Sequence, residues 1–271
     1  MIPLAELPGF YDRADELVLR DPAFGQAHAG LLRGLESGEL RVARPREGAW
    51  EVQTWIKRAI LLGFRATSLE EMPGWGMPAV DKGAYPPRRL GLDDGVRLVP
   101  GGSAVRRGAY VAPGVVVMPP AYINVGAYVD EGTMVDSHAL VGSCAQVGRR
   151  VHLSAGAQLG GVLEPAGATP VVVEDEAFVG ALAGVFEGVR VRRRAVLAPG
   201  VILTAHTTIF DLVNGRQWQG EVPEGAVVVP GSRPASGAYA QGLGLQLGAA
   251  VIVKIRDAGT DAATALEEAL R

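Results

Sequence analysis

The sequence predicts a mainly β protein whose centre is a parallel β-helix, preceded by a mostly helical segment and followed by a short cap of strand and helix. Three observations support this prediction. Aliphatic residues recur every six positions through most of residues 105–209, a small or aliphatic residue follows each of them by four positions, and 37 glycines accompany only 6% aromatic residues. Many tight corners around a narrow aliphatic interior would account for all three.

Composition limits the classes of function. A chain of 271 residues with 48% hydrophobic residues can form one large folded unit or two modest ones. A formal net charge of −3 gives no general attraction to nucleic acid, and no apolar stretch approaches the roughly 18 residues that span a bilayer. The start lacks a secretory pattern and Cys144 is the single cysteine. We therefore expect a cytoplasmic protein with no nucleic-acid or membrane partner.

Residues 1–100 are expected to form the N-terminal domain. Residues 1 to about 70 read as helical, with the clearest helices over 26–37 and 52–64, where residues 54–62 are amphipathic. Residues 71–90 are rich in proline and glycine and predict a loop.

The six-residue repeat defines a β-helix over residues 101–232. Six residues advance an α-helix by about 240°, so helical repeats would not share a face. A fixed period of six instead indicates one strand and one corner per repeat, with three repeats closing a triangular coil. The aliphatic positions are Val105, Val111, Val117, Ile123, Val129, Val135, Val141, Val147, Leu153 and Leu159, then Val173, Val179, Val185, Val191, Leu197, Leu203 and Ile209.

The position after each aliphatic residue is interpreted as the corner that needs an unusual backbone conformation. Glycine, asparagine and aspartate tolerate such conformations best. This slot holds Asn124, Asp130, Asp136, Gly142, Gly148 and Gly160.

The repeat is interrupted once, and its end is capped. Leu159 and Val173 are fourteen positions apart rather than twelve, which predicts a protruding loop at about 164–171. Residues 233–271 form the predicted C-terminal extension. Strands near 227–229 and 249–254 and a helix over 260–270 would cover the open end of the coil, which otherwise exposes pairing edges.

Three runs in the repeat, 129–136, 141–148 and 160–165, resemble signatures of the tetrahydrodipicolinate N-succinyltransferase family of hexapeptide-repeat acyltransferases. The resemblance extends to 38–43, 96–100 and 250–254, and so covers nearly the whole chain. It implies a left-handed coil and a homotrimer with active sites between neighbouring coils. It also implies transfer of succinyl from succinyl-CoA to the amino group of ring-opened tetrahydrodipicolinate, in the diaminopimelate route to lysine. Succinyl-CoA would be a co-substrate, with no cofactor bound permanently.

The implied chemistry needs a group that holds and deprotonates the amine, donors for the thioester oxygen, and a cation for the dicarboxylate. Asp136 matches the motif aspartate of the family, although it could also be only a corner residue. Arg97 matches the arginine that binds a substrate carboxylate, the alternative being a solvated surface arginine. For the pantetheine arm of CoA, the resemblance implies contacts near Ala181, Ala198 and Gly200.

The sequence departs from the best-known members at one place. Where they have an Arg-Ser-Glu run, this chain has Leu182-Ala183-Gly184, so the catalytic glutamate of the family falls on Gly184. Glu187 is the nearest carboxylate and the candidate replacement, the alternative being an exposed corner glutamate. The run Arg190, Arg192, Arg193 and Arg194 could meet the phosphates of CoA or form a solvated face.

Other readings remain open. A related CoA-dependent N-acyltransferase could use acetyl-CoA or another amine, and a trimeric hexapeptide-repeat protein could lack catalysis altogether. Related acetyltransferases use a histidine base, for which His138, His152 and His206 are candidates. We expect no metal, because the histidines and the single cysteine lack ligand spacing.

Overall fold

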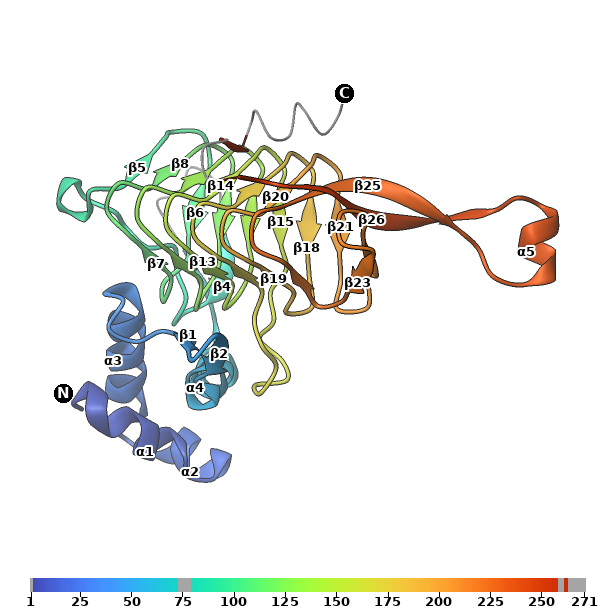
Figure 1. Cartoon of the computed structure of the whole chain (residues 1–271). Helices are drawn as coiled ribbons and strands as arrows, with labels where there is room; N and C mark the ends of the chain where they lie inside the picture. Colours follow the sequence, from blue (N-terminus) through green and yellow to red (C-terminus); the bar gives the residue numbers. More distant parts are fainter. Residues whose placement is uncertain (1, 73–78, 258–260, 263–271) are drawn as a thin grey trace.

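The repeat folds into a parallel β-helix that forms the body of the molecule, which confirms the predicted fold class (Figure 1). The structure is a computed structural model that describes residues 2–72, 79–257 and 261–262. Strands pair in parallel with the strand eighteen residues later, as Tyr110 does with Tyr128 and Tyr128 with Gln146. The interval is longer where further residues are inserted, as between Gln146 and Val172 and between Arg190 and Glu221. Three six-residue repeats therefore make one coil, as predicted.

The coil has three sheets, which we call I, II and III. Sheet I contains β7 (Tyr110–Val111), β10 (Tyr128–Val129), β13 (Gln146–Val147), β16 (Val172–Val173), β19 (Arg190–Val191) and β24 (Glu221–Val222). Sheet II contains β5 (Arg97–Leu98), β8 (Val116–Val117), β11 (Met134–Val135), β14 (His152–Leu153), β17 (Phe178–Val179), β20 (Val196–Leu197) and β25 (Ala226–Pro234). Sheet III contains β6 (Ala104–Val105), β9 (Tyr122–Ile123), β12 (Leu140–Val141), β15 (Gln158–Leu159), β18 (Gly184–Val185) and β21 (Ile202–Leu203).

The interior of the coil is the stack that the period of six predicts. The second residue of each two-residue strand points inward, and Val129, Val135 and Val141 have no exposed surface. Small residues four positions later, such as Ala127 and Ala145, complete each layer. Burying one such valine or leucine side chain contributes roughly 1.5–3 kcal/mol, so the repeated layers supply most of the stability of this region.

The predicted corner slot needs a correction. The left-handed backbone occurs at the third residue after the aliphatic position, as at Gly132 (φ 69°) and His138 (φ 61°), and not at the first. At the first position an Asp or Asn side chain accepts the next backbone N–H, as Asp136 Oδ1 does from Ser137 at 2.7 Å. Glycine occurs there because neighbouring coils come close: a Cβ on Gly142 would lie 2.3 Å from the amide nitrogen of Gly161.

The interruption of the repeat is larger than the spacing suggested. Strands β15 and β16 occupy consecutive places around the coil, so the fourteen positions between Leu159 and Val173 are one repeat plus eight further residues. The extra residues form a loop that projects from the coil beside the N-terminal helices (Figure 1). Lys57 holds this loop, because its Nζ donates to the carbonyl oxygen of Ala168 at 2.7 Å.

The N-terminal region is helical but contains hairpins that the sequence prediction missed. Its helices are η1 (Leu4–Glu6), α1 (Leu7–Tyr11), α2 (Asp15–Arg20), α3 (Phe24–Glu36) and α4 (Thr54–Ala66), and η2 (Leu92–Asp94) follows later. Within the stretch read as helical, β1 (Ala43–Arg46) and β2 (Ala49–Val52) pair around a two-residue turn. Both turn residues, Glu47 and Gly48, have positive φ, which matches the twist of a tight hairpin. Strands β3 (Leu69–Glu71) and β4 (Val80–Lys82) likewise pair where a loop was predicted.

The N-terminal region packs on the outer face of sheet I. Arg41 donates from Nε to Gln146 Oε1 at 2.7 Å and lies over the ring of Tyr128, and Trp50 donates to Glu174 Oε1 at 3.1 Å. Val125 and Cys144 from the coil join the same buried cluster as the helices. These contacts cover sheet I. On sheet II the outward-facing Val196 and Val227 are also fully buried, whereas Arg97 at the other end of the sheet is exposed.

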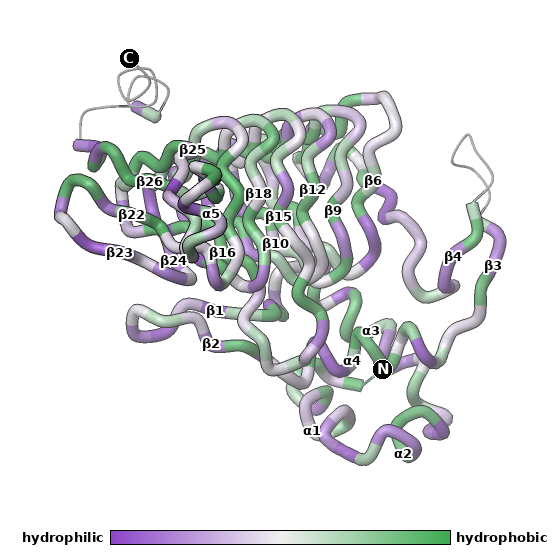
Figure 2. The backbone as a smooth tube through the Cα atoms, turned by 90° about the vertical axis from the view of Figure 1, so that its right-hand side faces the viewer, coloured by the Kyte–Doolittle hydropathy of each residue, from purple (hydrophilic) through white to green (hydrophobic). Residues whose placement is uncertain are grey.

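The C-terminal part ends the coil and then leaves it. Strands β22 (Ile209–Asp211) and β23 (Arg216–Trp218) form a hairpin, so the last predicted interior position, Val213, is 50% exposed rather than buried. Figure 2 shows β23 as a hydrophilic strand outside the coil. The predicted strands are confirmed but longer: β25 pairs with β26 (Gln246–Ile255), and the two extend beyond the coil as an arm carrying α5 (Ala238–Gly242) (Figure 1). The terminal helix predicted over 260–270 lies outside the described residues apart from 261 and 262.

Candidate active site

Four of the predicted site residues lie along one edge of the coil. Asp136, Ala181, Ala198 and Gly200 all occupy the II–III corner, in the four successive coils that contribute residues 136–139, 154–157, 180–183 and 198–201 to it. The preceding strands β11, β14, β17 and β20 are successive neighbours in sheet II. At about 4.8 Å between strands, Asp136 and Ala198 are roughly 14 Å apart, which gives the corner room for an extended ligand.

Asp136 has an oxygen available at one end of this edge. Its Oδ1 accepts the Ser137 N–H at 2.7 Å, and the carboxylate makes no ion pair with any of the described residues. His152 lies close enough for the negative charge of Asp136 to oppose the main effect of burial, which lowers the pKa of His152. The His152 ring also stacks on Phe178, with centroids 5.0 Å apart. Asp136 can therefore receive a cationic group from a ligand.

Arg97 lies on the outer face of sheet II, near Asp136. It pairs with Val116, and Val116 pairs with Met134, two residues before Asp136. Strand geometry then places the Cα atoms of Arg97 and Asp136 roughly 12 Å apart. The Arg97 side chain is exposed and forms no ion pair within the described part of the chain. A ligand with a carboxylate and an amino group could bridge the two.

The backbone of the corner offers two donors that have no partner among the described residues, the N–H groups of Ala155 and Ala181. The N–H groups of Ala198 and Gly200 are used by the coil, at 2.8 Å to Val228 and 2.9 Å to Ala181. The N–H of Ala181 has no partner among the described residues, because Gly180 before it has no side-chain acceptor of the kind that Asp136 provides. Gly180 is itself required, since a Cβ there would lie 2.6 Å from the carbonyl oxygen of Leu197. Sequence reasoning named Ala181 but missed this cause.

Glu187 lies on a different corner. It follows β18, at the III–I corner that also carries the protruding loop, and its carboxylate accepts the Ala205 N–H at 3.2 Å. The coil therefore does not bring Glu187 to Asp136 within one chain. At Gly184 an added Cβ would lie 2.4 Å from the ring of Phe186 and 3.0 Å from Ile202, so apolar side chains fill the space where a side chain would begin.

The arginine run belongs to sheet I and the I–II corner, and it is engaged in ion pairs. Arg190 pairs with Glu174 at 2.6 Å, Arg192 with Glu221 at 2.9 Å, and Arg193 with Glu176 at 3.1 Å. Hydrogen bonds from Arg150 and Arg193 lower the pKa of Glu176. These contacts favour the interpretation of the run as a solvated face.

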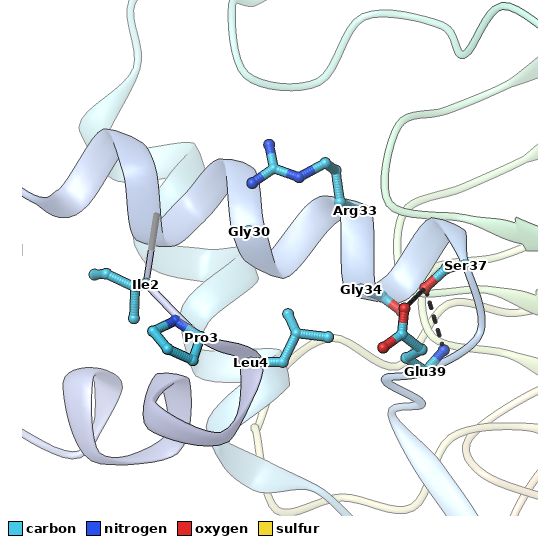
Figure 3. A pocket seen from close by; sticks show the side chains of 8 residues that line it. All are labelled: Ile2, Pro3, Leu4, Gly30, Arg33, Gly34, Ser37 and Glu39. Atoms are coloured by element: carbon cyan, nitrogen blue, oxygen red, sulfur yellow. Dashed lines mark hydrogen bonds between the residues drawn. The ribbon is translucent and has the colours of Figure 1, made fainter.

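The N-terminal region contains a separate pocket of about 350 Å³, lined by Ile2, Pro3, Leu4, Gly30, Arg33, Gly34, Ser37 and Glu39 (Figure 3). Its polar contact is local, with the Ser37 hydroxyl donating to Glu39 at 3.0 Å. It contains none of the predicted site residues. Among residues 2–72, 79–257 and 261–262, no group of three potential metal ligands occurs, and no helix is long and apolar enough to cross a membrane.

The fold and the corner site together define a hexapeptide-repeat β-helix of the acyltransferase type. The family model "Tetrahydrodipicolinate N-succinyltransferase N-terminal" matches residues 10–66, and "Hexapeptide repeat of succinyl-transferase" matches residues 170–205. The 2,3,4,5-tetrahydropyridine-2,6-dicarboxylate N-succinyltransferase of Azoarcus sp. (strain BH72) is 49% identical over 255 residues, covering 92% of this chain and 90% of the relative. The enzyme of the same name from Nitrobacter winogradskyi is 48% identical, covering 88% and 86%. The chain belongs to the 2,3,4,5-tetrahydropyridine-2,6-dicarboxylate N-succinyltransferase family.

A solved structure shows the same fold at low sequence identity. It is described as a candidate 2,3,4,5-tetrahydropyridine-2-carboxylate N-succinyltransferase from Campylobacter jejuni and matches with a TM-score of 0.53 and 14% identity. The match covers 91% of this chain and 64% of that one.

Proposed function

We propose that the protein transfers succinyl from succinyl-CoA to the amino group of ring-opened tetrahydrodipicolinate, as a homotrimer in the cytoplasm, in the diaminopimelate route to lysine. Family membership over 92% of the chain supports the reaction. The observation that carries the assignment of residues is the II–III corner, where Asp136 with an unpaired oxygen and Ala181 with an unpaired N–H occupy one edge.

The proposed step is attack of the amine on the thioester. Asp136 holds the ammonium group and accepts its proton, which leaves the neutral amine as the nucleophile. The amine nitrogen bonds to the thioester carbon, the C–S bond breaks, and the CoA thiolate leaves and is protonated. The Ala181 N–H donates to the oxygen that becomes negative during attack, and Arg97 pairs with a carboxylate of the acceptor. The pantetheine arm extends along Ala198 and Gly200.

Glu187 enters this proposal only from a neighbouring protomer. Because it lies on the III–I corner, it cannot reach Asp136 of its own chain, whereas a site between two coils could combine the two corners. Without it, positioning by Asp136 and Arg97 with water as the final proton acceptor is sufficient, since a neutral amine attacks a thioester readily once the two are held together.

The test is release of CoA thiol with succinyl-CoA and 2-aminopimelate as acceptor, for the wild type, Asp136→Asn and Asp130→Asn. Asp130 is the matched control, because it occupies the same slot on another corner and accepts the Glu131 N–H at 2.9 Å. Loss of a general base typically costs a factor of about 100 or more in kcat/KM, which we expect for Asp136→Asn alone. Equal activity in the two variants would remove Asp136 from the mechanism. Absence of CoA binding by the wild type would favour the non-catalytic reading.

A further inference from the structure

His152 is a second titratable group beside the carboxylate that holds the amine. It is the outward-facing residue of β14 and pairs with Met134, and Asp136 follows Met134 by two positions on the same face. The backbone N–H of Asp136 donates to the carbonyl oxygen of Leu153 at 2.9 Å, which fixes the two segments against each other. Two residues along and one strand across place the Cα atoms of His152 and Asp136 roughly 8 Å apart. One amine nitrogen between them can therefore contact both side chains.

The His152 ring is held in place while its nitrogens stay available. One face of the ring stacks on Phe178, with an angle of 6° between the ring planes and centroids 5.0 Å apart. Neither ring nitrogen has a hydrogen-bond partner within the described part of the chain. The buried side-chain atoms that lack a partner belong to Arg13 and His28, so the nitrogens of His152 are not enclosed. A stacked ring with free edges presents its nitrogens to a ligand.

The surroundings of His152 keep the imidazole neutral at pH 7. Burial is the larger effect and lowers the pKa of His152 from its ordinary value of 6.5, while the negative charge of Asp136 opposes this change. Met134 and Phe178 flank His152 on the two neighbouring strands and carry no charge. Asp136 is therefore the charged group that acts on this ring, and a neutral imidazole in this position can accept a proton.

Acylation of an ammonium group releases two protons, and Asp136 accounts for one of them. The first proton leaves before the amine attacks. The second leaves after the nitrogen has bonded to the thioester carbon, and until then the adduct can return to amine and thioester. A positioned imidazole accepts such a proton far more effectively than water does.

We propose that His152 is a catalytic residue that accepts the second proton from the amine nitrogen. The N–H bond breaks, its electron pair stays on nitrogen as the amide forms, and the proton bonds to an imidazole nitrogen. The C–S bond then breaks, and the sulfur leaves with the electron pair of that bond. Of the two protons, one ends on the CoA sulfur and the other in water. The inference rests on the proposed function for the place of the acceptor amine.

The experiment measures release of CoA thiol from succinyl-CoA with 2-aminopimelate, for the wild type, His152→Gln and His138→Gln. His138 is the competing imidazole, since it is exposed and lies two residues after Asp136. A general base contributes a factor of about 100 to 10,000, so kcat of His152→Gln should fall about 100-fold or more, with little change in KM. In the wild type, kcat should fall as the pH falls through the pKa of His152, below 6.5, because the imidazole becomes protonated. This decrease should be absent in His152→Gln.

Added imidazole distinguishes proton transfer from a merely structural role of the ring. His152→Ala leaves a gap beside the Phe178 ring, in which a free imidazole can stack. Imidazole should restore part of the turnover of His152→Ala, whereas pyrazole, which has the same shape but is not basic at neutral pH, should not. Equal restoration by the two compounds would overturn the proposal, as would loss of turnover in His138→Gln rather than in His152→Gln.

NMR titration of the imidazole groups tests the pairing of His152 with Asp136 without any turnover. The chain has four histidines, and the signal of His152 is the one that is missing from His152→Gln. Asp136→Asn removes the negative charge that favours the imidazolium, so the pKa of His152 should fall further in this variant. An unchanged titration would show that the two groups do not interact and would overturn the proposal.

The proposal and the function beneath it fail differently. Full turnover in His152→Gln would remove His152 as the second proton acceptor and leave succinyl transfer by Asp136 intact. Absence of turnover in the wild type would remove the proposed function and this step with it.

Discussion

His28 should make the stability of the protein depend on pH between about 6.5 and 4. The side chain is 4% exposed, stacks on Phe24 with centroids 5.5 Å apart, and has a buried Nε2 with no hydrogen-bond partner among the described residues. Burial, with a smaller contribution from Arg107, lowers the pKa of His28 from 6.5 to about 4. The folded state therefore holds this imidazole neutral.

The sign and size follow from proton linkage. Between pH 6.5 and 4 the unfolded chain binds a proton at His28 that the folded chain does not, so the free energy of unfolding falls as the pH falls. A fall of the pKa from 6.5 to about 4, at roughly 1.4 kcal/mol for each pH unit, gives a loss of about 3.5 kcal/mol across this window. Above pH 6.5 both states are neutral at His28 and the contribution is constant.

The assay is urea unfolding at fixed protein concentration from pH 7.5 to 4.5, for the wild type and His28→Leu. Carboxylates titrate in both proteins, so the difference between the two curves isolates His28. The free energy of unfolding of the wild type minus that of His28→Leu should decrease toward low pH, because leucine does not bind a proton in either state. Parallel curves for the two proteins across the range would refute the argument and show that the pKa of His28 is the same in the folded and the unfolded protein.

Three further predictions concern packing. Lys57→Met removes the donor that binds the carbonyl oxygens of Ala168 and Pro165, at 2.7 and 3.4 Å. Hydrogen exchange of the amides in the loop 164–171 should therefore accelerate, while the amides of the coil stay protected. Unchanged exchange would show that other contacts hold the loop. Leu159→Ala opens a cavity at a fully buried coil position and should lower the free energy of unfolding by about 2–5 kcal/mol, whereas the same change at exposed Leu17 should cost little. Gly142→Ala places a Cβ 2.3 Å from the backbone nitrogen of Gly161 and should lower Tm by several degrees in calorimetry. The control is Gly167→Ala, because no atom lies within 4 Å of a Cβ at that position. Equal effects of the two substitutions on Tm would disprove the close contact.

The period of six predicted the coil because one chemical requirement recurs at every layer. A residue such as Val141 needs only a small aliphatic partner above and below, so local spacing encodes the fold. The hairpin of β1 and β2 lacked such redundancy, and its signal was the single Glu47-Gly48 turn. The arm of β25 and β26 was underestimated because apolar spacing shows where a buried strand ends, and the outer part of the arm is exposed.

The six-residue spacing predicts on which corner of the coil a site residue lies, but not which contacts it makes there. Asp136, Ala181 and Ala198 meet on one corner because whole coils plus the inserted loop separate them, and Glu187 lies one corner further on. The availability of the Ala181 N–H depends on the absence of a side-chain acceptor at Gly180, which the spacing of aliphatic residues does not describe. The support of the loop by Lys57 had no sequence signal beyond the apolar face of α4.

The eighteen-residue coil restricts how the dimensions of the corner can vary in evolution. Adding or deleting one complete coil between Asp136 and Ala198 would lengthen or shorten their separation by a single strand spacing of about 4.8 Å and keep every side chain on its own face. Gaining or losing six residues would instead rotate the later residues to another sheet. Selection for longer or shorter ligands in such a scaffold must therefore act through discrete steps, with side chains on the corner providing all finer adjustment.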